Sequence, residues 1–305
     1  MQLNEKGQGQ EQLKVNVKGI TGITASTSKG NQIKWRKGNL WIKADMQGYE
    51  GLAEEFASLV LDCTQIPHVR YKTCLIETSQ GKYRGCCSQT MYEKGDSFYS
   101  ISRLYETYGL VLERSRRTEP SIEIIENVIE FVKTHYMLDI TDYLINTLYF
   151  DKLVANEDRH INNLGIIRKA TGNYAIAPIF DNGLSFLARE EVWGKYDDFV
   201  YALNRVRYIP FGNKQVRALR KKYPNKKLII NKTKVYRLLN NYTNDLYPRY
   251  QVQRCKDILR WQLECSENCD NHFNFTSSNS NSNSNSNSNR DNDNKESGGL
   301  YWKLI

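Results

Sequence analysis

The sequence predicts an α+β fold of two lobes, with a small β-rich amino-terminal lobe followed by a larger helical carboxy-terminal lobe. Three observations predict this class. Apolar and polar residues alternate in several short stretches between residues 13 and 92, as they do in half-buried strands. After Asp96, apolar residues recur at intervals of three and four, as they do along one face of a helix. Finally, 305 residues with 40% hydrophobic and 25% charged side chains are enough for one large or two small globular domains.

The amino-terminal lobe is expected over residues 13–92. It follows a polar stretch, residues 1–12, that is rich in Gly and Gln and is expected to be flexible. A helix is expected over residues 49–62, because its apolar residues fall on one stripe. The alternating stretches predict strands at residues 13–18, 39–44, 69–77 and 82–92.

A segment of small residues, 24–35, connects the first two predicted strands. Its Ser, Thr and Gly residues can bring several backbone N–H groups and hydroxyls close to a bound anion. With a single glycine the segment is a weak phosphate-binding signal, and a plain connection between strands is the alternative.

The helical lobe is expected over residues 93–275, with a hinge between the lobes at 94–96. Thr141 or Asp142 is a plausible cap for one of its helices. Residues 276–305 are expected to be a disordered tail, because their Ser/Asn repeat contains no apolar residue to bury. Helices are expected at residues 101–111, 122–134, 142–154, 196–203 and 234–265, and in the basic segment between the last two.

The formal net charge of +9 is unevenly distributed. The basic segment, residues 205–237, could attract an acidic protein or a nucleic acid, and a solvated helical face is the alternative. Its cations are Arg205, Arg207, Lys214, Arg217, Arg220, Lys221, Lys222, Lys226, Lys227, Lys232, Lys234 and Arg237.

The cysteine count and the absence of long apolar runs indicate a cytoplasmic protein without a transmembrane segment. Seven cysteines are an odd number, no secretory leader precedes them, and no run of about 18 apolar residues is present. Reduced thiols are therefore expected. The array Cys255, Cys265, Cys269 and His272 does not have the spacing of common zinc sites, so unpaired thiols are favoured over a zinc centre there.

The most informative feature is a set of three polar residues. Asp158 is followed five residues later by Asn163, and Asp181 comes 18 residues after that, directly behind an apolar run. Phosphotransfer sites use such a set: one Asp to orient or deprotonate the attacking hydroxyl, and an Asn with a later Asp to hold Mg²⁺ against the ATP phosphates. Each motif alone can be a helix cap or a hairpin turn, but their order and spacing favour catalysis.

A phosphotransfer site also needs a lysine for the ATP phosphates and a glutamate that holds this lysine. Lys43 lies near the end of the second predicted strand, and the next helix contains Glu54 and Glu55. The apolar stripe of that helix does not decide between the two glutamates.

Taken together, 156–165 (Asn-Glu-Asp-Arg-His-Ile-Asn-Asn-Leu-Gly) and 177–183 (Ala-Pro-Ile-Phe-Asp-Asn-Gly) resemble the HipA-like serine/threonine kinases, particularly the compact CtkA-like members. The similarity covers roughly residues 20–265 and implies a two-lobed protein-kinase-like fold. It places catalysis on Asp158, Mg²⁺ binding on Asn163 and Asp181, and ATP-phosphate binding on Lys43 with Glu54, rather than Glu55, as its partner. It also implies a phosphate-covering loop at Ser28, Lys29 and Gly30, and an adenine-binding connector at 88–92 that includes Gln89 and Met91.

The resemblance implies an ATP- and Mg²⁺-dependent kinase that phosphorylates Ser or Thr of a protein substrate. Members of this family are similar in autophosphorylating a serine of the phosphate-covering loop, for which Ser26, Thr27 and Ser28 are candidates here. Two alternatives remain. Arg159 and His160 also match the Asp-Arg-His of phosphatidylinositol kinases, so the acceptor could be a lipid. A non-catalytic regulatory or toxin–antitoxin binding protein is the other, and the intact polar residues argue against it.

Overall fold

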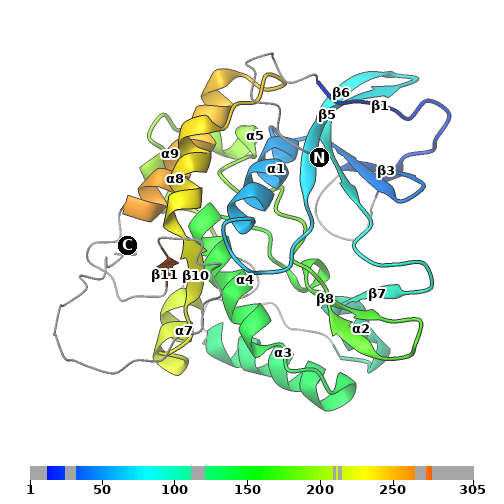
Figure 1. Cartoon of the computed structure of the whole chain (residues 1–305), viewed down its shortest axis with the longest axis vertical. Coiled ribbons are helices and arrows are strands. Elements are labelled where there is room, and N and C mark those ends of the chain that lie inside the picture. Colours follow the sequence, from blue (N-terminus) through cyan, green and yellow to red (C-terminus); the bar gives the residue numbers. More distant parts are fainter. Residues whose placement is uncertain are drawn as a thin grey trace, which may run out of the picture.

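The computed structural model describes residues 12–24, 32–110, 121–208, 211, 215–264 and 273–276. Within them, a curled β-sheet built from the amino-terminal part stands beside a mainly helical part (Figure 1). Three expectations concern residues outside the described ranges: the flexible first residues, the phosphate-covering loop at 25–31, and the Ser/Asn-rich tail after Thr276. The array Cys255, Cys265, Cys269 and His272, expected to hold unpaired thiols, also lies mostly outside them, since only its Cys255 is described.

Six strands form the amino-terminal sheet in the order β1-β5-β6-β4-β3-β2. All neighbours are antiparallel except β1 and β5, which run parallel. One face of the sheet encloses a small apolar core that includes Trp35, Ile42 and Ile76. Because side chains alternate along a strand, this leaves Lys43 on the opposite face. The strands are β1 (Lys14–Asn16), β2 (Ile23–Thr24), β3 (Ile33–Lys37), β4 (Leu40–Ala44), β5 (Tyr71–Thr78) and β6 (Gly81–Gln89).

Strand β3 corrects the expectation that residues 24–35 form only a connecting segment. Ile33–Lys37 pairs with β4, and Trp35 is buried against Ile42 in the apolar core. The alternation in this strand is only five residues long and directly follows a run of small polar residues, which concealed it.

Helix α1 (Glu50–Leu61) follows β4 and packs between the sheet and helices α8 and α9 (Figure 1). Its close approach to the sheet depends on two glycines. A Cβ atom on Gly51 would lie 2.5 Å from the carbonyl carbon of Gly85 in β6, and a Cβ atom on Gly85 would lie 2.0 Å from the carbonyl oxygen of Lys43. Both distances are shorter than any non-bonded contact, so only glycine fits where the helix crosses the sheet.

The larger lobe is built around α4, whose Leu144, Ile145 and Leu148 are buried in the main apolar core. A three-stranded antiparallel sheet in the order β7-β8-β9 lies at the boundary with the first lobe, and a 3-10 turn, η1, lies between α4 and β8. These elements are β7 (Ser97–Ser100), α2 (Ile101–Thr107), α3 (Ser121–Tyr136), α4 (Thr141–Val154), η1 (Ile161–Asn163), β8 (Gly165–Arg168), β9 (Tyr174–Ile176), α5 (Glu190–Trp193), α6 (Phe199–Leu203), α7 (Gln215–Lys222), α8 (Lys232–Asn241) and α9 (Arg249–Glu264).

Three expectations about the second half of the chain were wrong. The basic segment is not entirely helical, because it contains β10 (Leu228–Asn231), which pairs in parallel with β11 (Phe273–Thr276). The helix expected over 234–265 is two helices, α8 and α9, separated at 242–248, and Pro248 directly precedes the second. Proline is well tolerated at a helix start but not in its interior, so it separates the two. The helix expected over 196–203 begins only at Phe199, where the Asp198 side chain accepts hydrogen bonds from Val200 N and Tyr201 N.

Five of the seven cysteines lie in the described residues, and all five are buried free thiols. Among the same residues no helix combines the length and the apolar character needed to cross a bilayer.

The Gly51→Ala substitution should destabilise the protein, because the added methyl group forces α1 away from the sheet. Overpacking of this kind costs about 1–3 kcal/mol. Denaturant unfolding monitored by circular dichroism measures the change.

The matched control is Gly183→Ala, whose Cβ would meet its nearest neighbour, the Cβ atom of Glu50, at an ordinary 3.4 Å. This variant should differ from the wild type by less than about 1 kcal/mol. Equal stability of the two variants would contradict the close packing at Gly51.

Candidate functional site

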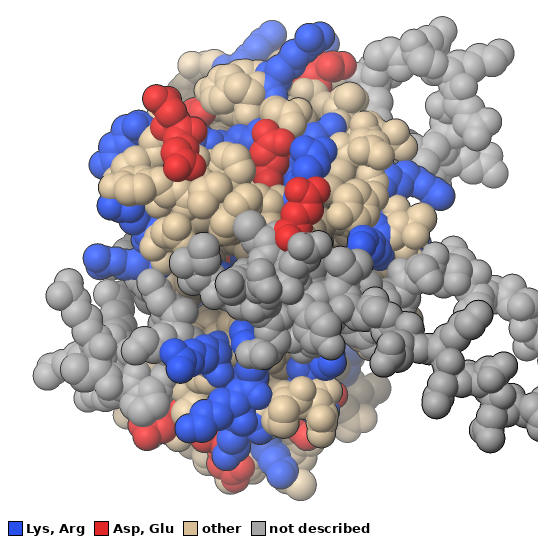
Figure 2. Space-filling model, turned by 90° about the vertical axis from the view of Figure 1, so that its left-hand side faces the viewer, with Lys and Arg blue, Asp and Glu red and all other residues tan. Residues whose placement is uncertain are grey.

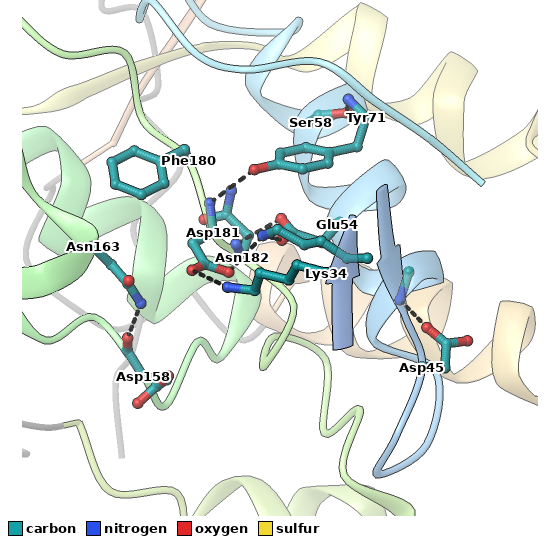
Figure 3. Close-up of polar contacts among 12 residues, drawn as sticks. Lys34, Asp45, Glu54, Ser58, Tyr71, Asp158, Asn163, Phe180, Asp181 and Asn182 are labelled. Carbon is teal, nitrogen blue, oxygen red and sulfur yellow. Dashed lines mark hydrogen bonds and ion pairs between the residues drawn. The ribbon is translucent and has the colours of Figure 1, made fainter. Parts of the chain in front are cut away.

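The predicted functional residues come from four parts of the chain and meet between the two lobes (Figure 3). Lys43 lies on β4 and Glu54 on α1. The segment that carries Asp158 and Asn163 follows α4, whose C-cap residue, Ala155, has the left-handed conformation with φ of 54°. That residue turns the chain out of the helix and toward the interface between the lobes. Asp181 follows β9 and also has a left-handed φ, 59°.

Lys43 contacts two of the predicted residues at once. Its Nζ lies 2.6 Å from Glu54 Oε1 and 2.8 Å from Asp181 Oδ1, so one ammonium group joins the amino-terminal lobe to the chain after β9. The ammonium also lies 5.1 Å from the centre of the Tyr71 ring, within cation–π range. Burial alone would lower the pKa of Lys43, but the charges of Asp181 and Glu54 outweigh it and raise the pKa well above its usual value. Lys43 is therefore a fixed positive charge.

Glu54 and Glu55 have different contacts, although they are neighbours on α1. Both oxygens of the buried Glu54 are used, since Oε1 pairs with Lys43 and Oε2 accepts a 2.7 Å hydrogen bond from the backbone N–H of Asn182. Burial raises the pKa of Glu54, and Lys43 opposes this shift. Glu55 points instead to β5, where it binds Lys72 Nζ at 2.8 Å and accepts from the backbone N–H of Thr73 at 2.8 Å.

Asp181 is held on both its backbone and its side chain. Its N–H donates to the Tyr71 hydroxyl at 3.3 Å, and its Oδ2 lies 3.9 Å from Lys34 Nζ on β3. Burial would raise the pKa of the Asp181 carboxyl, but Lys43 and Lys34 hold it well below its usual range. The side chain is therefore a carboxylate at any pH near neutrality, as a cation ligand must be.

Asp158 and Asn163 lie on the other side of Asp181 from Glu54 (Figure 3). The Asn163 amide nitrogen donates to the Asp158 carbonyl oxygen at 2.9 Å, which leaves its amide oxygen available to a cation. The Asp158 side chain is 41% exposed, and its Oδ2 lies 3.6 Å from His160 Nε2. Burial of part of this carboxyl raises its pKa, and His160 opposes the shift. A raised pKa favours acceptance of a proton from a bound hydroxyl.

The donor atoms fit a hard divalent cation. Mg²⁺ prefers oxygen ligands and is commonly held by one or two carboxylates together with phosphate oxygens and water. One carboxylate, Asp181, and one amide oxygen, Asn163, match this pattern. Within the described ranges no cluster of three or more His, Cys, Asp or Glu side chains offers an alternative metal site.

The remaining predicted residues are less well defined. Gln89 is an exposed residue at the end of β6, whereas Met91 packs with Phe180 against an apolar cluster of Val69, Tyr71 and Cys86. Tyr71 belongs to both this cluster and the polar contacts of Lys43, so an apolar surface borders the charged site. Ser26, Thr27, Ser28, Lys29 and Gly30 lie outside the described residues.

Sequence reasoning missed Lys34, Tyr71 and Asn182 as members of the site. Lys34 is directly opposite Lys43 in the β3–β4 register, so recognition of the β3 strand would have found it. Tyr71 reaches Asp181 from 110 residues away, a contact that no local pattern indicates.

Figure 2 faces the side of the molecule on which α7 and α8 lie in Figure 1, and Lys and Arg side chains gather on its lower part. Some of the basic segment's cations are already paired with acidic side chains, Lys222 with Glu126 at 2.7 Å and Lys226 with Asp142 at 2.6 Å. Arg217, Lys221 and Lys227 of the same segment are exposed.

Comparison with solved structures finds proteins of similar fold. A Helicobacter pylori proinflammatory kinase, CtkA, is similar with a TM-score of 0.54 and 16% sequence identity, over 81% of this chain and 94% of CtkA. HipA of the Shewanella oneidensis MR-1 toxin–antitoxin system, solved with HipB and operator DNA, has a TM-score of 0.43 and 8% identity, over 81% of this chain and 64% of HipA. No protein-family model matches the sequence. No curated protein matches it either. The similarity to CtkA confirms the fold that the sequence resemblance predicted: the chain has the two-lobed α+β fold of a CtkA-like kinase.

Proposed function

We propose that the chain is an ATP- and Mg²⁺-dependent kinase that transfers phosphate to Ser or Thr of a protein. The observation that carries this proposal is the double contact of Lys43 with Glu54 and Asp181, on a kinase-like fold and beside Asp158 and Asn163. In the proposed reaction this combination would supply a fixed cation, metal ligands and a proton acceptor in one place. Kinases require all three.

Each residue has a distinct role in the proposed reaction. Lys43 aligns the ATP phosphates, and Glu54 holds Lys43 in position through the 2.6 Å ion pair. Asn163 and Asp181 would hold Mg²⁺, which neutralises charge on the phosphates when it is bound. Asp158 orients the acceptor hydroxyl and accepts its proton. Catalysis then depends mostly on positioning and on charge compensation.

Asp158→Ala and Asp181→Ala should each reduce phosphotransfer by at least about 10²–10⁴-fold, because one removes the proton acceptor and the other a metal ligand. Incubation with labelled ATP and Mg²⁺, followed by mapping of the labelled product, measures the loss. Protein acceptors and phosphatidylinositol vesicles are offered in parallel, so that the same assay identifies the acceptor.

Asp197→Asn is the control, because this exposed carboxylate lies outside the site and its loss should leave activity unchanged. Wild-type activity in the Asp181 variant would refute its assignment as a metal ligand. If only the vesicles are labelled, the acceptor is a lipid and not a protein.

Glu54→Gln and Glu55→Gln should affect different properties of the protein, although the two residues are adjacent. The first weakens the hold on Lys43 and should lower kcat, whereas the second removes the ion pair with Lys72 and should mainly lower stability. Steady-state kinetics and thermal melts of both variants test this. A larger loss of activity in Glu55→Gln would reverse the assignment of the Lys43 partner.

Autophosphorylation is expected at Ser26, Thr27 or Ser28, in the proposed phosphate-covering loop between β2 and β3. A phosphate there would add about −1.5 to −2 charges next to the ATP phosphates and should lower ATP affinity by repulsion. Mass spectrometry after incubation with ATP and Mg²⁺ locates the phosphate, and Asp158→Ala serves as the inactive control. Equal phosphate in that control, or phosphate only elsewhere, would refute this feedback.

A further inference from the structure

A buried ion pair, Asp151 with Arg159, lies next to the site and has no part in the roles assigned above. Asp151 is on the last turn of α4, and Arg159 directly follows Asp158. Their exposed fractions are 0% and 2%, so both charges are removed from water. The guanidinium forms a bidentate contact with the carboxylate, since Nε lies 3.0 Å from Oδ2 and Nη2 lies 3.0 Å from Oδ1.

The remaining guanidinium N–H groups reach the two segments that carry the proposed metal ligands. Nη1 donates to the backbone carbonyl of Asn163 at 3.3 Å and to that of Phe180 at 2.5 Å. Nη2 donates to the side-chain oxygen of Asn182. The hydrogen bonds therefore hold the backbone of one ligand, Asn163, and the residues on both sides of the other, Asp181.

Stability alone does not account for this arrangement. A buried ion pair usually contributes little net stability, because desolvation of both charges offsets their attraction. A planar group with five donors in fixed directions is instead suited to setting the relative position of several acceptors. Asp181 has a left-handed backbone, which for a non-glycine residue must be held by its surroundings.

We propose that Arg159, oriented by Asp151, is a positioning residue that sets the distance between Asn163 and Asp181 and so determines the affinity of the site for a divalent cation with nucleotide. The inference rests on the proposed function, because it takes Asn163 and Asp181 as the metal ligands. Arg159 itself touches neither cation nor nucleotide in this role. It acts through the backbone of its neighbours.

Arg159→Lys tests the role, because lysine keeps the positive charge but cannot make the forked set of hydrogen bonds. The dissociation constant of Mn²⁺ is measured by electron paramagnetic resonance in the presence of a non-hydrolysable ATP analogue. The dissociation constant of the analogue is measured separately without metal. Loss of an outer support typically weakens metal binding about 10–100-fold, so the first constant should rise by that factor while the second stays unchanged.

Arg189→Lys is the matched control. Arg189 also makes a two-point contact with the same segment, at 2.8 Å and 2.6 Å to Glu157. None of its hydrogen bonds in the described structure reaches Asn163 or residues 180–182, so Mn²⁺ affinity should stay at the wild-type value.

Asn182→Ala covers the case in which Arg159→Lys does not fold. It deletes one acceptor of Arg159 without leaving a charge unpaired, and the backbone N–H of residue 182 can still donate to Glu54. Mn²⁺ affinity should again fall, by a smaller factor.

Wild-type Mn²⁺ affinity in folded Arg159→Lys, or in Asn182→Ala if the first variant does not fold, would overturn the positioning role. So would an equal loss in Arg189→Lys. The proposed function fails in a different way, namely if the wild-type protein binds Mn²⁺ with the analogue but transfers no phosphate from ATP. In that case the positioning test can still be completed on binding alone.

Discussion

The organisation of the site depends on the buried ammonium group of Lys43. Its contacts with Glu54 and Asp181, both shorter than 3 Å, join a strand and a helix of one lobe to the segment that enters the other. Removal of one member of a buried ion pair leaves an uncompensated charge at a cost of about 3–5 kcal/mol. Displacement of α1 from β4 would have the same effect as removal of Glu54. The ion pair therefore links the packing of the small lobe to the geometry of the site.

The packing of the sheet against α1 provides this geometry. Glu54 reaches Lys43 only because Gly51, one turn earlier on the helix, allows the backbone of α1 to approach Gly85. Asp45, two residues after Lys43, reinforces the same junction. Its Oδ1 accepts a hydrogen bond from the N–H of Gly51 at 2.6 Å, and its Oδ2 accepts one from the Tyr247 hydroxyl at 2.7 Å (Figure 3 shows the first). Through Asp45, Tyr247 of the helical lobe therefore supports the start of α1, the helix that carries Glu54.

The sequence predicted those features that depend on local patterns. Long periodic stretches such as α3 and α4 were found, and the fold class followed from them together with the alternating strands. Asp158, Asn163 and Asp181 were selected as candidates because phosphotransfer requires fixed residue types at characteristic spacings, and their roles stay a prediction. The strands β3, β10 and β11 were missed. Each has only four or five residues, which is too short a stretch for the alternation of apolar and polar residues to be recognised, and each is defined by its pairing with another strand.

Contacts between residues that are far apart in the sequence could not be predicted from local patterns either. Glu54 and Glu55 are equivalent on the helical stripe, and what separates them is that Glu55 accepts a hydrogen bond from the β5 backbone at Thr73. Tyr71 and Lys34 reach Asp181 from other strands. Local sequence therefore identified the candidate chemical groups, and tertiary packing decided which of them meet.

The solvent exposure of the four charged residues, Glu54, Lys43, Asp181 and Asp158, matches the roles that they have in the proposed reaction. Exposed side-chain fractions rise from 0% for Glu54 and 10% for Lys43 to 24% for Asp181 and 41% for Asp158. Groups that must stay fixed lie where packing immobilises them and where low dielectric strengthens their attraction. The group that must meet an incoming hydroxyl lies where solvent, and hence an acceptor, can reach it. Asp158 is nevertheless tied to the fixed part, because Asn163 donates to its carbonyl oxygen and Arg159, the next residue, is anchored on α4. Its carboxylate can therefore be open to solvent without a loss of position.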